Sequence, residues 1–115
     1  MATVWEEPEI SSIVETLQRS SIRPGMHVGE VTPTAIYNFL GAYRRGVYEA
    51  MTPIAIRKFE NVMEQVIHDL GLPELRSFHT ILLERGQAES EVIKTMFEVE
   101  IQTWLRFEEE LRKFT

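Results

Sequence analysis

The chain has 115 residues, 43% hydrophobic and 26% charged, which is typical of one globular domain and not of a disordered segment. Its net charge of −6, without a basic stripe, disfavours binding to nucleic acid or to a membrane surface. The absence of cysteine excludes disulfides and thiolate chemistry; together with an N-terminus that lacks an apolar signal core, it leads us to expect a cytoplasmic protein.

The first 31 residues predict one helix followed by an irregular arm. After Pro8, apolar residues recur at helical spacing from Ile10 to Leu17, which predicts a short amphipathic helix ending near residues 20–21. A turn at residues 23–25 follows, and residues 26–31 are expected to be extended or irregular. We therefore divide the chain into an N-terminal helix and arm, 1–31, and a helical bundle, 32–115, within one domain.

Two Thr-Pro pairs mark the starts of the next helices. In Thr32-Pro33 and in Thr52-Pro53, threonine is a good N-cap, and proline suits the first helical position because its missing N–H has no intrahelical partner there. The third helix should close at Gly71.

The remaining helix start and stop signals predict two more helices. Pro73 should open a fourth helix that closes at Gly86, and the last helix should begin at 87–89 and run nearly to the C-terminus. The short connections favour antiparallel neighbours. The predicted fold is therefore all-α, an up-down four-helix bundle with an extra N-terminal helix and an irregular arm.

The helix that opens at Thr32-Pro33 and the last helix each carry more than one apolar or aromatic face. A second apolar face on a small helical protein is usually buried against a partner chain, although a central helix can be apolar on two sides within one chain. Gly41 and Gly46, each unfavourable inside a helix, indicate a close helix contact that is either with a partner or within the chain. We expect a homodimer interface on these second faces, with Tyr37, Gly41, Tyr48, Phe97, Trp104 and Phe107 as its anchors.

Four basic residues form a second candidate surface, for an acidic partner segment: Arg44, Arg45, Arg57 and Lys58. If the helices that meet at Thr52 pack antiparallel, these residues lie near one another and make a local positive patch on an acidic protein. The alternative is a solvated face on which they offset neighbouring glutamates.

Little in the chain indicates catalysis or a cofactor. Serines lack a neighbouring histidine in a nucleophile pattern, and no glycine-rich phosphate loop is present. Glu64, His68 and His79 could supply two imidazoles and a carboxylate to a metal, but they form no HExxH motif. We expect no enzyme activity, no cofactor and no metal, and keep a small metal-binding protein as the least favoured alternative.

A series of features runs in order from Tyr43 onward: Tyr43-Arg44, Thr52, the helix from Ala55 to Leu70, Leu72-Pro73-Glu74-Leu75, Phe78-His79 and Ile81-Leu82-Leu83-Glu84. In this order the chain resembles the helical dimerisation domain shared by the C-terminal part of the clock protein KaiA and the N-terminal part of the phosphatase regulator RsbU. The resemblance covers about 70 residues and implies a four-helix bundle that dimerises and regulates a partner enzyme by binding it. Two features depart from that domain: the fourth helix ends early, at Gly86, and the arm of residues 1–31 has no counterpart there.

These observations favour a non-enzymatic regulatory module that binds and modulates a partner protein, with itself as a second partner in a homodimer. The alternative is an acidic inhibitor or immunity-type protein that masks a basic toxin or enzyme. Its contact residues would be Glu98, Glu100 and Glu108–Glu110.

Overall fold

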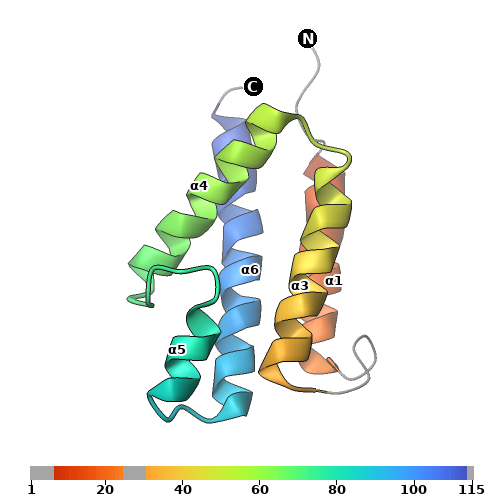
Figure 1. Cartoon of the computed structure of the whole chain (residues 1–115). Coiled ribbons are helices and arrows are strands. Elements are labelled where there is room, and N and C mark those ends of the chain that lie inside the picture. Colours follow the sequence, from red (N-terminus) through yellow and green to blue (C-terminus); the bar gives the residue numbers. More distant parts are fainter. Residues whose placement is uncertain (1–6, 25–30, 114–115) are drawn as a thin grey trace.

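The structure, a computed structural model, describes residues 7–24 and 31–113, and these residues form helices without a strand (Figure 1). All but the last residue of the expected irregular segment, 26–31, lies outside the described residues. The prediction of an all-α fold is confirmed for the described part of the chain. The helices are α1 (Glu7–Ile22), α3 (Pro33–Tyr48), α4 (Pro53–Asp69), α5 (Phe78–Glu84) and α6 (Glu89–Arg112).

The central element is α6, the longest helix, against which α1, α3, α4 and α5 all pack. No other pair of described helices approaches as closely. In Figure 1, α1 descends, α3 ascends, α4 and α5 descend, and α6 ascends. From their shared turn, α3 and α4 diverge, and α6 lies behind the space between them. Each therefore packs on α6 instead of on the other.

Side-chain caps begin α3 and α4 as the sequence predicted. The hydroxyl oxygens of Thr32 and Thr52 accept hydrogen bonds from the backbone N–H groups of Ala35 and Ala55, each at 3.1 Å. Each cap satisfies one of the N–H groups that a helix start leaves without an intrahelical partner.

Glycine ends α4 and α5, also as predicted. Gly71 and Gly86 follow these helices with φ angles of 69° and 88°, a left-handed conformation that costs glycine little because it has no Cβ. Directly after Gly71 in the chain, the N–H of Leu72 donates to the carbonyl of Ile67 at 3.1 Å, as in a Schellman motif.

The predicted start of the fourth helix at Pro73 is wrong, because α5 begins at Phe78. Turns occupy the connection, in which the N–H of Leu75 donates to the carbonyl of Pro73 at 2.8 Å. No side chain from residue 73 to 77 is fully buried, and Leu75 is 52% exposed. Phe78 is the first side chain of this segment to enter the core. Because the residues before it bury no side chain against the core, packing does not stabilise a helix there.

The core centres on aromatic rings of α4 and α6. Phe59 lies 4.1 Å from Trp104 and 5.4 Å from Phe107 between ring centroids. Trp104, Phe107 and also Phe97 are buried within the chain. Their expected place in a homodimer interface is therefore wrong: other helices of the same chain pack on α6 from more than one side and cover both of its apolar faces.

The N-terminal helix belongs to the same core. Ile10, Ile13 and Leu17 of α1 are buried with the side chains of α4 and α6 in one cluster, since α1 packs along α6. Among the described helices, none combines the length and the apolar character that a bilayer-spanning segment requires.

Trp104→Ala is expected to lower the free energy of unfolding by about 3–5 kcal/mol, because it removes the ring that contacts Phe59 and leaves a cavity. Urea denaturation followed by circular dichroism measures this. Leu105→Ala is the matched control, because Leu105 is next in the helix and 41% exposed; its change should stay near 0.5 kcal/mol, as is typical of surface positions. Equal losses in the two variants would contradict the placement of Trp104 in the core.

Candidate functional site

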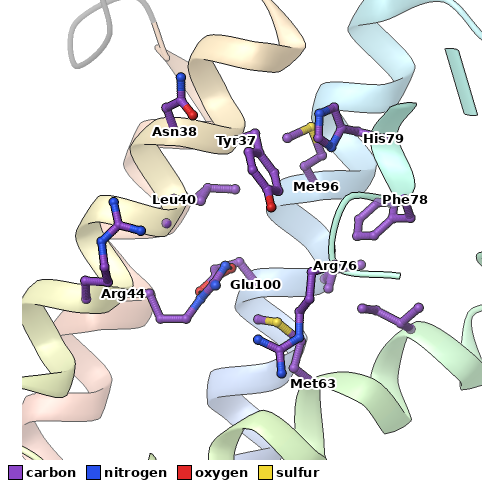
Figure 2. Close-up of a pocket in the computed structure, with 14 residues that line it drawn as sticks. Tyr37, Asn38, Leu40, Arg44, Met63, Arg76, Phe78, His79, Met96 and Glu100 are labelled. Carbon is purple, nitrogen blue, oxygen red and sulfur yellow. Dashed lines mark hydrogen bonds and ion pairs between the residues drawn. The ribbon is translucent and has the colours of Figure 1, made fainter. Parts of the chain in front are cut away.

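A pocket of about 130 Å³ lies between α3 on one side and α4 and α5 on the other, with α6 as its floor. Figure 2 shows side chains from all these elements converging on it: Tyr37 from α3, Met63 from α4, His79 from α5, and Met96 and Glu100 from α6. Its existence follows from the divergence of α3 and α4. The pocket has both apolar and charged walls, and it is our candidate functional site.

A buried ion pair closes one end of the pocket. The Glu100 carboxylate, 2% exposed on α6, accepts two hydrogen bonds from Arg44 of α3: from Nε at 3.0 Å and from Nη2 at 2.7 Å. This two-point geometry is the strongest that a guanidinium and a carboxylate can adopt. Because an unpaired charge would be very costly in this interior, the pair holds α3 in a defined position on α6.

At another wall of the pocket, Tyr37 of α3 lies against His79 of α5, with ring centroids 4.6 Å apart. His79 is only 5% exposed, and its Nδ1 atom has no hydrogen-bond partner in the described structure. Burial lowers the pKa of His79 below its ordinary value, so the imidazole is neutral at neutral pH. The hydroxyl of Tyr37 points into the pocket, toward Glu100 (Figure 2).

The turn before α5 brings Arg76 to the pocket. Its guanidinium lies 3.7 Å from a carboxylate oxygen of Glu60 and 3.7 Å from one of Glu64. Both distances exceed that of a hydrogen bond, and all three side chains are partly exposed. Arg76 is therefore held much more loosely than Arg44.

Beyond the pocket, Tyr48 links α3 to the aromatic core. Its ring meets that of Phe59 edge-on at 5.9 Å, and its hydroxyl is buried without a hydrogen-bond partner among the described residues. Burial raises the pKa of Tyr48 to about 12.

The predicted interface residues thus divide between the pocket and the core. Tyr37 and Gly41 line the pocket, and Tyr48 lies on the same face of α3, half-buried. The second face that the sequence assigned to α3 is therefore the pocket wall.

The basic residues do not act as one open patch. Arg44 is committed to Glu100. Lys58 faces the end of α6, where it helps to lower the pKa of Glu110, although less than Lys113 does. Arg45 and Arg57 are exposed. The expected pairing of α3 with α4 fails because both helices pack on α6.

The three residues weighed as metal ligands have separate neighbours. His68 Nδ1 lies 3.0 Å from an oxygen of Glu74, Glu64 faces Arg76, and His79 packs against Tyr37. In residues 7–24 and 31–113, no group of three or more His, Asp or Glu side chains is arranged to hold a metal ion.

Sequence reasoning missed the roles of Glu100 and Arg76 in the pocket. Glu100 does carry a signal: it falls in phase with the buried positions Met96, Thr103 and Phe107 of α6, so a carboxylate on this stripe requires a cationic partner. Arg76 carries none, because only the course of the turn brings it to the pocket.

No protein-family model, curated protein or solved structure matches this chain. The chemistry of the site therefore follows from its own groups. It combines an apolar hollow with a phenol, a neutral imidazole, an arginine–carboxylate pair and a second, loosely held arginine. Groups of this kind hold a ligand or a partner side chain by hydrogen bonds and apolar contact.

Arg44→Met should lower the free energy of unfolding by about 3–5 kcal/mol, because it leaves Glu100 buried without its partner. Adding Glu100→Met should recover much of that loss, since two apolar side chains replace a charged pair. Urea denaturation of the singles and the double gives the coupling energy.

The matched control is Arg106→Met. Arg106 donates to Asp69 at 2.7 Å, but both side chains are substantially exposed, so this variant should lose no more than about 1 kcal/mol. A double variant as unstable as Arg44→Met alone would contradict the account of the buried pair.

Tyr48→Phe should change the pH dependence of stability. In the unfolded chain the phenol ionises near pH 10, whereas burial keeps it protonated in the folded chain until about pH 12. The folded state then binds the extra proton, so stability falls as pH rises between these values. The stability of Tyr48→Phe should fall less steeply over this pH range. At pH 7 the variant should be no less stable than the wild type, because the lost hydroxyl has no partner. Equal slopes in chemical denaturation at pH 7 to 11 would refute this.

Proposed function

We propose that this chain is a non-enzymatic regulatory module that binds and modulates a partner protein and associates as a homodimer. The observation that carries the proposal is the face of α3 beside the pocket. Tyr37 is 39% exposed on it, and Gly41 and Arg45 follow at helical spacing. Tyrosine and arginine are enriched at protein interfaces. This face, rather than α6, is the contact surface that we propose.

The two glycines of α3 support a contact outside the chain. Each costs about 1 kcal/mol relative to alanine inside a helix. A Cβ added at Gly46 would meet nothing within 4 Å, and one at Gly41 would meet only Arg45 Nη1, at 3.7 Å. No close contact within the described chain requires either glycine. Close approach by a helix of another molecule along the Tyr37 face explains Gly41, whereas Gly46, about 140° around the helix, lies on another face of α3.

The finer architecture belongs to the same proposal. We propose an up-down four-helix bundle, supported by the alternating directions of α1, α3, α4 and α6 in Figure 1, with α5 continuing in the direction of α4. The resemblance to the helical domain of KaiA and RsbU, which dimerises, supports self-association. An acidic segment of the partner protein would contact the exposed guanidinium groups of Arg45 and Arg57.

The acidic inhibitor is less well supported by the geometry. Glu100 is buried against Arg44, Glu108 lies near Arg112 at 3.7 Å, and Glu110 accepts from Lys113 at 2.7 Å. These carboxylates already face cations of their own chain, so they offer less charge to a basic toxin.

Light scattering after size-exclusion chromatography, over a concentration series, tests the proposal. We expect a mass of twice the 13.4 kDa of the chain and a shift toward the monomer in Tyr37→Glu, which places a charge in the contact. The control is Gln102→Glu, which adds the same charge on the exposed side of α6. A wild-type monomer at every concentration, or equal masses for the two variants, would count against the α3 contact.

A further inference from the structure

We infer that the pocket between α3, α4, α5 and α6 binds a small carboxylic acid whose apolar body is about the size of one ring. The size follows from the volume. The pocket measures about 130 Å³, and an apolar cavity of about 150 Å³ in another protein holds benzene. A drug-sized ligand or a folded peptide would need several times this space.

The charges that line the pocket favour an anion. Arg44, Arg45 and Arg76 line it, against one carboxylate, that of Glu100. Because Arg44 and Glu100 neutralise each other, the lining retains the charges of the other two arginines. Glu60 and Glu64 offset Arg76 from outside the pocket lining, at 3.7 Å and from more exposed positions. A ligand carboxylate can therefore form the close, two-point contact that Arg76 lacks.

The remaining walls suit the body of such an acid. Met63, Met96 and Phe78 offer apolar surface, and methionine adapts its shape to aromatic rings. His79 adds an unsatisfied polar atom, Nδ1, in a side chain only 5% exposed. The cost of a buried polar atom without a partner therefore falls on a residue of the pocket wall.

A ligand at this position would connect to the contact face, since Tyr37 and Gly41 belong to both. The acid would then be the signal that modulates partner binding. This regulatory step rests on the proposed function, whereas the binding itself concerns the isolated chain and is measured on it.

Methionine methyl NMR of the full chain tests the binding. With ¹³C-methyl methionine, the Met63 and Met96 signals report from the pocket lining, and Met51, buried elsewhere in the core, serves as the internal control. Titration with phenylacetate should shift the first two saturably and leave Met51 unchanged. Phenylacetamide, its uncharged analogue, should bind at least about tenfold more weakly because it cannot pair with an arginine.

Two variants and one control locate the site. Arg76→Gln should weaken phenylacetate binding at least about tenfold and leave phenylacetamide unaffected. Arg106→Gln, a similarly exposed arginine outside the pocket lining, should change neither. Gly41→Leu should block both ligands by occupying the pocket, with circular dichroism and an unchanged Met51 signal showing that the fold is intact. Absence of shifts at millimolar phenylacetate, equal affinity for the amide, or an unaffected Arg76→Gln would each overturn the inference.

The failure of binding and the failure of self-association have different signatures. If the chain binds phenylacetate but stays monomeric, the carboxylate site is supported and the proposed homodimer is contradicted. A dimer whose Met63 and Met96 signals do not respond would overturn the carboxylate site and leave the α3 contact in place.

Discussion

The fold depends on the burial of α6 on more than one side. Each of the other helices packs on it, so its apolar residues face α1 and α3 as well as α4 and α5. A helix in this position cannot carry an unpaired charge without a large cost in free energy, yet α6 carries Glu100 in its middle. Arg44 resolves the conflict by reaching from α3 with two hydrogen bonds. One carboxylate therefore ties the position of α3 to the helix at the centre.

The pocket is a geometric consequence of this arrangement. Because α3 and α4 both pack on α6, they diverge from the turn at Thr52, and the side chains of neither fill the space between them. The turn before α5 then directs Arg76 into that space, and α5 places His79 beside Tyr37. The site thus combines a loosely held arginine, Arg76, with one pair, Arg44 and Glu100, that is tightly satisfied.

Local chemistry made the starts of α3 and α4 and the ends of α4 and α5 predictable, whereas the start of α5 and the site depended on contacts between distant residues. The hydroxyl of Thr52 accepts from an N–H only three residues along the chain, and Gly71 ends α4 through its own backbone conformation, so a short window of sequence contains the whole cause. Periodicity showed that α6 has two apolar faces but not what covers them, and Trp104 was assigned to a partner for that reason. Arg44 and Glu100 lie 56 positions apart. Their pairing follows from which helix occupies the centre, which no local pattern contains.

Some residues on the α3 side reduce the stability of the folded chain, and this favours a binding role for that side. Two glycines sit inside α3 without a close neighbour that requires them, and the buried Nδ1 of His79 lacks a hydrogen bond. A protein selected only for stability would remove both costs by alanine substitution and by an apolar residue in place of the histidine. The α1 side of α6 shows the contrast, since Ile10, Ile13 and Leu17 fill it with apolar side chains. Gly41 and His79 both line the pocket, so the costs at these two positions lie where a ligand or a partner can make new contacts.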